Sequence, residues 1–297
     1  MVKEKLSGII TPMVTPLNRD YAQTINYIAT SELIEHLISN GVSGIFILGS
    51  NGEFHVLSYE EKCKFIKYVV EKVNFRIPVF VGVGDCNFNE VIDLAKYSKL
   101  VGADALSLVP PYFIKPTDDE ILEYFKKVSE ISNLPIIVYN IPKNTGYTIN
   151  KDLLDELFKI ENIVGIKDSS GDENLLLQYL DISKKYNKSV LVGSDSKISF
   201  GYKNGASGAI AGTSNLITKL LVDLWDCLER DDIKAIKLQK DIDVLRECLK
   251  FNTVPSVLKR SMELANICET GPARLPVKDI KEMYDDKLIE MLRFYNL

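Results

Sequence analysis

The chain has 297 residues, of which 46% are hydrophobic and 26% charged, and its formal net charge is −5. This composition is ordinary for a soluble globular protein, and an acidic balance without a basic patch argues against nucleic acid as a partner. No apolar run approaches the length of a membrane span, and the N-terminus lacks the long apolar core of a signal peptide. We therefore expect a cytoplasmic protein with no membrane partner. The length suits two ordinary domains or one eight-stranded α/β barrel.

Cysteine and histidine are too sparse to suggest a metal centre. The five cysteines show no metal-ligand spacing, so we expect buried, reduced thiols. They are Cys63, Cys86, Cys227, Cys248 and Cys268. With only His36 and His55, the chain cannot build a histidine-rich metal site, and we expect no metal.

Short β-type runs alternate with helical segments along most of the chain. Eight such runs start about 20 to 36 residues apart, which suits a strand followed by a crossover helix. The runs are residues 8–14, 44–49, 78–84, 105–110, 135–140, 163–168, 189–194 and 208–212. We predict an α/β fold, a (β/α)₈ TIM barrel. A doubly wound sheet is the alternative, but the first run lacks the glycine-rich turn that it requires.

Helix signals fill the intervals between these runs. Residues 30–40 place their apolar side chains on one face. Ser58 and Thr117 each open a capping box with a glutamate three residues later, and Asn87 and Asn150 stand where helices begin.

The chain stays helical beyond the last run. Periodic apolar patterns cover residues 213–232, 231–250, 254–266 and 277–294. This is more helix than one barrel unit requires. We therefore predict a barrel over 1–215, and over 216–297 the last barrel helix with a C-terminal helical extension packed on the barrel as one structural unit.

Lys167 lies near the carboxyl end of the apolar run 163–168, where active sites of such barrels are built. An ammonium group is costly to bury, and a lysine that loses its proton is a nucleophile toward carbonyl carbon. The plain alternative is a strand-end lysine whose head reaches solvent.

Two further strand ends suit a keto-acid substrate. The loop Gly49–Glu53 brackets Ser50 and Asn51 with glycines, and backbone N–H groups in such loops favour small anions, although the same pattern also makes ordinary turns. Tyr139 lies at the end of the run 135–140. It is a candidate proton shuttle, or simply a tyrosine at the edge of the core. Together with Lys167 these residues fit the condensation of an α-keto acid on an amine.

Four motifs resemble one known family. GIITPMVTP at 8–16, GSNGE at 49–53, YNIP at 139–142 and GIKDSSG at 165–171 are similar to the dihydrodipicolinate synthase / N-acetylneuraminate lyase family. The resemblance covers about residues 5–295. It implies a barrel with a C-terminal helical region, a homotetramer, and a class I lyase or aldolase that uses pyruvate and a small aldehyde with no metal or organic cofactor.

The resemblance also implies roles for individual residues. It makes Lys167 the Schiff-base lysine and Tyr139 the proton shuttle. It places Ser50 and Asn51 at the pyruvate carboxylate and Ile210 where a backbone carbonyl lines the pyruvate pocket. The remaining expected substrate contacts are Thr11, Gly49 and Asn144.

Three departures from the family pattern affect the expected substrate. Asn51 stands where threonine is usual, Phe113 (beside Tyr112) where a tyrosine reaches across a subunit interface, and Asn144 where the synthases carry an arginine for the carboxylate of aspartate semialdehyde. Lys143 is the nearest substitute. We therefore predict a 2-keto-3-deoxy acid or 4-hydroxy-2-oxoglutarate aldolase-like enzyme. The alternative is a 4-hydroxy-tetrahydrodipicolinate (dihydrodipicolinate) synthase or an N-acetylneuraminate lyase.

Two rival hypotheses stay open from sequence. Glycines 205, 208 and 212 could cradle a phosphate, which would suggest a sugar-phosphate aldolase. A barrel can also serve as a keto-acid-binding sensor without turnover, because fold does not dictate function.

Overall fold

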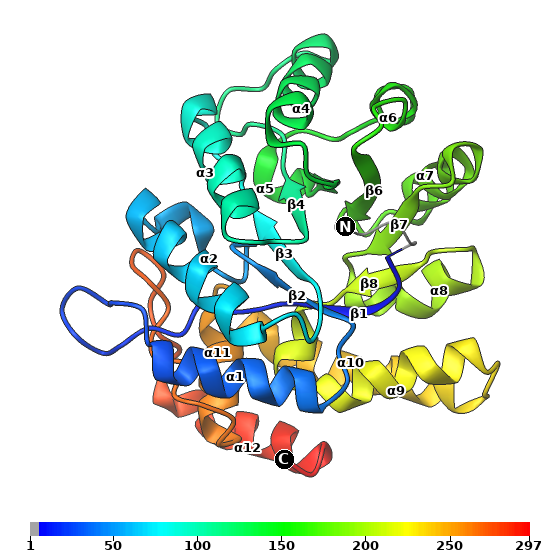
Figure 1. Cartoon of the computed structure of the whole chain (residues 1–297). Helices are drawn as coiled ribbons and strands as arrows, with labels where there is room; N and C mark the ends of the chain where they lie inside the picture. The colour runs from blue at the N-terminus through cyan, green and yellow to red at the C-terminus, as the bar shows by residue number, and fades with distance from the viewer. Residues whose placement is uncertain (1–5) are drawn as a thin grey trace.

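The computed structural model describes residues 6–297 and shows a closed barrel of eight parallel strands surrounded by helices (Figure 1). The strands are β1 (Gly8–Pro12), β2 (Gly44–Ile47), β3 (Val79–Gly82), β4 (Ala105–Leu108), β5 (Ile136–Asn140), β6 (Ile163–Asp168), β7 (Ser189–Val192) and β8 (Gly208–Ile210). They pair in chain order, and β8 closes the barrel against β1. The TIM-barrel prediction is confirmed. Residues 1–5 of the predicted barrel segment lie outside the described residues.

Local capping signals set the starts of the barrel helices. The capping boxes at Ser58 and Thr117 are present, and Asn87 and Asn150 accept backbone N–H groups at two further starts. The helix predicted over 30–40 begins earlier, because Asn26 caps it. The helices are α1 (Tyr27–Ser39), α2 (Tyr59–Val73), α3 (Phe88–Leu100), α4 (Asp118–Ser132), α5 (Pro142–Thr145), α6 (Lys151–Phe158), α7 (Glu173–Tyr186), α8 (Ile198–Lys203), α9 (Thr218–Glu229), α10 (Lys234–Cys248), α11 (Ser256–Leu264) and α12 (Asp285–Phe294).

The apolar core has two parts, because parallel strands are buried on both faces. One cluster lies inside the barrel and also includes Tyr139, near the carboxyl end of β5. Its large members are Phe46, Phe80, Ile137 and Leu191. A larger cluster fills the space between the strands and the helices. Burying one large apolar side chain contributes roughly 1.5–3 kcal/mol, so this double core holds the strand ends in place.

The helices after α9 gather on one side of the barrel, drawn in orange to red in Figure 1. Leu245, Leu258 and Leu288 belong to the same apolar cluster as the barrel helices. The predicted boundary between residues 215 and 216 stays a prediction. The helix predicted over 277–294 is wrong in its first part, since α12 begins at Asp285. Tertiary hydrogen bonds hold the earlier part in another shape, for example from Asn252 Nδ2 to the Lys278 carbonyl.

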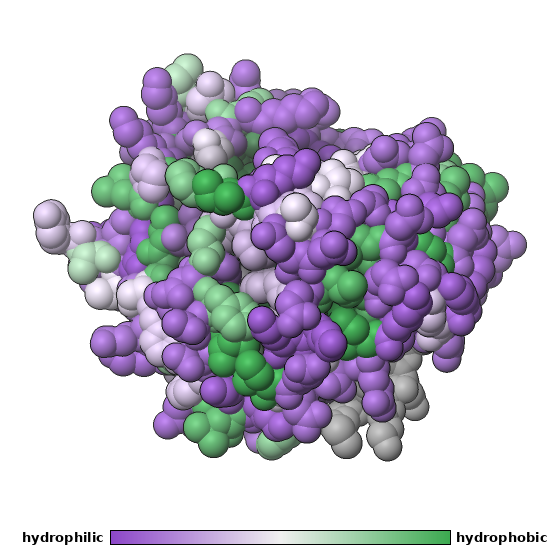
Figure 2. Space-filling view, turned by 90° about the horizontal axis from the view of Figure 1, so that it is seen from above, coloured by the Kyte–Doolittle hydropathy of each residue, from purple (hydrophilic) through white to green (hydrophobic). Residues whose placement is uncertain are grey.

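The surface is mostly hydrophilic on the face shown in Figure 2, where hydrophobic side chains form separate patches. No helix among residues 6–297 is both long and apolar enough to cross a membrane. The prediction of buried thiols is correct only for Cys248 and Cys268, because Cys86 is exposed and Cys63 and Cys227 are half-buried.

Candidate active site

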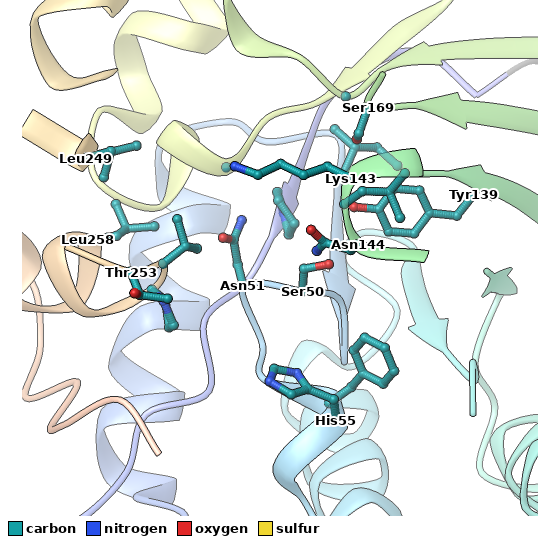
Figure 3. A pocket seen from close by; sticks show the side chains of 18 of the residues that line it. Ser50, Asn51, His55, Tyr139, Lys143, Asn144, Ser169, Leu249, Thr253 and Leu258 are labelled. Atoms are coloured by element: carbon teal, nitrogen blue, oxygen red, sulfur yellow. The ribbon is translucent and has the colours of Figure 1, made fainter. Parts of the chain in front are cut away.

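A cavity of about 960 Å³ lies at the carboxyl ends of the strands (Figure 3). Its wall combines the strand ends with the loops that follow them and with part of the C-terminal region. Six predicted site residues line it: Ser50, Asn51, Tyr139, Asn144, Lys167 and Ile210. In a barrel of this kind the active site is built at this end.

Lys167 lies inside the barrel with only 3% of its surface exposed. Its nitrogen is 3.8 Å from the centre of the Tyr139 ring and 5.0 Å from that of Phe46, so it is held against aromatic faces. No ion pair to Lys167 occurs among residues 6–297. The amine therefore lines the cavity, and no carboxylate of the described residues forms an ion pair with it.

Tyr139 is the direct register partner of Lys167 across β5 and β6. Burial raises the pKa of the Tyr139 phenol, but the positive charge of Lys167 and the nearby donor groups of Lys167, Ser50 and Ser169 outweigh this, so the pKa lies below its ordinary value. A lowered pKa makes the phenolate more accessible near neutral pH, which suits a group that takes and returns protons.

Ser169 also lines the cavity, although the sequence reasoning did not single it out. Its hydroxyl is buried and makes no well-aligned hydrogen bond within the described residues, yet it lies close enough to Tyr139 to lower the pKa of the phenol. Gly193 leaves the space, since a Cβ there would come within 2.1 Å of Ser169 Oγ. In the view of Figure 3 the Tyr139 hydroxyl lies between Ser50 and Ser169. Side-chain alternation would have identified Ser169, two residues after Lys167.

The loop after β2 presents Ser50 and Asn51 to the cavity. The Glu53 N–H donates to the Ser50 carbonyl at 3.2 Å, which closes the loop into a turn. Gly49 is buried and does not line the cavity, so its predicted substrate contact stays a prediction. A Cβ at this position would approach the Phe46 ring to 2.8 Å.

Thr11 is the second predicted contact that the cavity does not include. It is fully buried, and its hydroxyl lies 2.8 Å from that of Ser214. Successive strand residues face opposite sides of a sheet, and Pro12, the next residue, lines the cavity instead. In this structure Thr11 therefore lies outside the cavity wall, and its predicted substrate contact stays a prediction.

Two of the departures from the family pattern, Asn144 and Phe113, lie in different surroundings. Lys143 and Asn144 line the mouth of the cavity from α5, and Figure 3 shows the Lys143 side chain extending across it. Tyr112 lines the cavity, whereas Phe113 is 94% exposed, with a φ of 81°. Within this chain, the ring of Phe113 is not part of the site.

The structure does not support a phosphate site at glycines 205, 208 and 212. Of the three glycines, only Gly212 lines the cavity. The carboxylate of Asp195 accepts the N–H groups of Gly212 and Thr213, at 3.3 and 2.9 Å. A phosphate would need these donors and would meet a negative charge there. Among residues 6–297, no three His, Cys, Asp or Glu side chains are grouped so as to hold a metal ion.

The eight-stranded barrel is closed, and one cavity at the carboxyl ends of its strands holds an amine, a phenol and hydroxyl groups. This is the arrangement of a TIM-barrel enzyme. The model of the dihydrodipicolinate synthetase family matches residues 5–294. The chain belongs to this family and is an enzyme of the lyase class.

Curated and solved relatives agree with this assignment. A 4-hydroxy-tetrahydrodipicolinate synthase of Ehrlichia canis (strain Jake) is 35% identical over 301 aligned positions, which cover 100% of both chains. YagE, a prophage protein of this family from E. coli K12, has a structure in complex with pyruvate with a TM-score of 0.93 at 28% identity, covering 98% of this chain and 99% of YagE. The chloride-inhibited dihydrodipicolinate synthase of Acinetobacter baumannii, complexed with pyruvate, gives 0.91 at 31% identity, with 98% and 99% covered.

Proposed function

We propose that the chain is a pyruvate-dependent class I aldolase or lyase that forms a Schiff base on Lys167. The observation that carries the proposal is the position of this amine, which is 97% buried by its surroundings, unpaired with any described carboxylate, and in contact with Tyr139. Pyruvate in the structures of two relatives supports the choice of keto acid.

The geometry suits each step of such a reaction. The Lys167 amine attacks the ketone carbon, Tyr139 delivers a proton to the ketone oxygen, and water leaves as the iminium forms. The iminium withdraws electrons, so the methyl carbon loses a proton and an enamine results. The enamine adds to the aldehyde carbon, and water then releases the product and restores the amine. Tyr139 takes and returns the protons.

Ser50 and Asn51 are proposed to receive the carboxylate of pyruvate. Both line the cavity beside Tyr139, and a short glycine-bracketed loop offers hydroxyl, amide and backbone donors to a small anion. Ile210 lines the cavity from β8 and is proposed to border the pyruvate pocket.

The names of curated relatives favour the 4-hydroxy-tetrahydrodipicolinate synthase reaction, in which the acceptor is aspartate semialdehyde, over the aldolase predicted from the sequence. We therefore place the synthase reaction first. Lys143 at the cavity mouth is the group proposed to meet the carboxylate of the acceptor.

One observation favours the aldolase as a second candidate. Asn144 occupies the position of the synthase arginine, and no arginine lines the described cavity. An amide cannot replace the bidentate contact that a guanidinium makes with a carboxylate. An aldolase acting on a 2-keto-3-deoxy acid or on 4-hydroxy-2-oxoglutarate does not depend on that arginine.

A substrate screen separates the candidates. Purified enzyme is assayed for condensation of pyruvate with aspartate semialdehyde, and for pyruvate release from 2-keto-3-deoxy acids, 4-hydroxy-2-oxoglutarate and sialic acid. The synthase proposal predicts the highest kcat/KM for aspartate semialdehyde. A preference of tenfold or more for a cleavage substrate would replace it by the aldolase or N-acetylneuraminate lyase reaction. Pyruvate binding without any turnover would indicate a sensor.

A homotetramer and a cytoplasmic location stay predictions. The exposed Phe113 and Ile114, which are 94% and 72% accessible, support the expectation of a subunit contact beside the cavity. Sedimentation analysis of the purified protein tests the tetramer.

A further inference from the structure

A buried ion pair joins the proposed pyruvate loop to the C-terminal region. Lys259 Nζ on α11 lies 2.6 Å from Glu53 Oε2, and the two side chains are only 1% and 2% exposed. Lys259 also donates to the Pro272 carbonyl at 2.8 Å, and the other oxygen of Glu53 accepts the Arg274 N–H at 2.6 Å. Neither charged group lines the cavity, so the proposed chemistry does not use them.

The backbone conformation at Glu53 indicates what the ion pair stabilises. Glu53 has a φ of 58°, in the left-handed region that side chains other than glycine rarely adopt. Its N–H closes the turn on the Ser50 carbonyl, and Thr15 Oγ1 donates to the Gly52 carbonyl at 2.7 Å. An unfavourable backbone conformation persists only when the surrounding structure stabilises it. The contacts of the Glu53 carboxylate with Lys259 and with the Arg274 N–H fix the residue in this conformation.

Lys259, the other member of the pair, directly follows residues of the C-terminal region that line the cavity. We call this part of the lining, Val257, Leu258 and Val277, the outer wall. Val257 and Leu258, the two residues before Lys259 on α11, line the cavity, as does Val277 farther along the chain. A shift of Lys259 relative to Glu53 would therefore change the distance between the outer wall and the loop that carries Ser50.

We infer that Glu53 and Lys259 are positioning residues, whose buried ion pair holds the Ser50–Asn51 loop in the shape that receives the pyruvate carboxylate and sets its distance from the C-terminal wall. The inference rests on the proposed function. A buried ion pair adds little net stability compared with a neutral pair of similar volume, but it fixes one arrangement of the two partners. Loss of the pair should therefore weaken pyruvate binding more than folding.

The test compares two double variants, one that removes the buried pair and one that removes the ion pairs of Arg260, the next residue of α11. Glu53→Gln with Lys259→Met removes the buried pair while leaving an oxygen for the Arg274 N–H. Arg260→Met with Asp285→Asn removes the pair in which Arg260 Nε donates to Asp285 Oδ1 at 3.0 Å, together with the 3.6 Å contact of Arg260 with Glu263. Neither Arg260 nor Asp285 lines the cavity. For each protein, the pyruvate concentration giving half-maximal borohydride labelling of Lys167 is measured together with the thermal midpoint.

We expect the Glu53/Lys259 variant to need at least tenfold more pyruvate while still reaching full labelling, and the Arg260/Asp285 variant to stay within twofold of the wild type. A folded Glu53/Lys259 variant with unchanged half-saturation would overturn the inference. If this double variant does not fold, Glu53→Asp, which keeps both charges but shortens the reach of the carboxylate, should raise half-saturation at least threefold, and an unchanged value would refute the idea equally. Failure of the wild type itself to be labelled would instead refute the proposed function.

Discussion

Tyr139 and Lys167 are paired residues on neighbouring strands, and the lysine nitrogen lies 3.8 Å from the centre of the tyrosine ring. Because both are fixed by the barrel hydrogen bonds, the amine and the phenol meet without any loop having to move. The strand pairing therefore keeps the amine and the tyrosine ring side by side in the cavity, and the predictions below depend on this relationship.

Replacing Tyr139 with phenylalanine removes the proposed proton carrier but keeps the ring beside Lys167. General acid–base catalysis contributes roughly 10²–10⁴-fold, so kcat should fall by about a hundredfold or more. Labelling of Lys167 by pyruvate and borohydride should remain attainable, though slower. Tyr124→Phe is the matched control, since the Tyr124 hydroxyl is buried without a partner in the described residues and lies outside the cavity wall. Equal turnover in both variants would remove Tyr139 from the mechanism.

Ser169→Ala should change the pH dependence of the reaction. The Ser169 hydroxyl helps to lower the pKa of Tyr139, so its loss should raise that pKa and move the acidic limb of kcat/KM to higher pH. At neutral pH less phenolate is then present, and kcat/KM should fall by roughly twofold to tenfold, the range expected when one nearby hydroxyl donor is lost. The pH–rate profile is the measurement, and Ser169→Thr should restore it.

Ser107→Ala is the control for that experiment. The Ser107 hydroxyl is likewise buried in the barrel without a partner in the described residues, but it does not line the cavity. An identical limb in Ser169→Ala and in wild type, or an equal shift in Ser107→Ala, would contradict the assigned effect of Ser169.

Acceptor choice should respond to residues 143 and 144. Asn144→Arg restores a bidentate carboxylate partner, and kcat/KM for aspartate semialdehyde should rise by roughly tenfold or more. Lys143→Met should lower kcat/KM for the same acceptor while leaving pyruvate half-saturation unchanged. Steady-state kinetics with the acceptor varied at saturating pyruvate give both values. If neither variant changes acceptor use, the acceptor carboxylate binds elsewhere in the cavity.

Features that depend on neighbouring residues in the chain could be predicted from the sequence. The strands follow from short β-type runs, and the helix starts from caps such as Ser58 and Thr117, because the stabilising hydrogen bonds form within a few residues. The placement of Lys167 and Tyr139 also follows, since strand ends of a parallel barrel meet at one end.

Features that depend on long-range contacts could not be predicted. The pairing of Glu53 with Lys259 joins distant segments, and neither residue carries a local signal of burial. Which of Thr11 and Pro12 faces the cavity could not be read from the sequence, because the side-chain alternation of β1 is fixed by its register with β2 and β8. Residues 277–281 have a helical pattern, yet tertiary hydrogen bonds such as that to the Lys278 carbonyl prevail over it.

The central claim is that the Lys167 amine condenses with pyruvate. Incubation of the purified enzyme with pyruvate and borohydride, followed by proteolysis and peptide mass analysis, tests it most directly. We predict one stable adduct per chain, on the peptide that contains Lys167, and none in the Lys167→Arg variant. An adduct on another lysine, or an unmodified Lys167 at saturating pyruvate, would contradict the account.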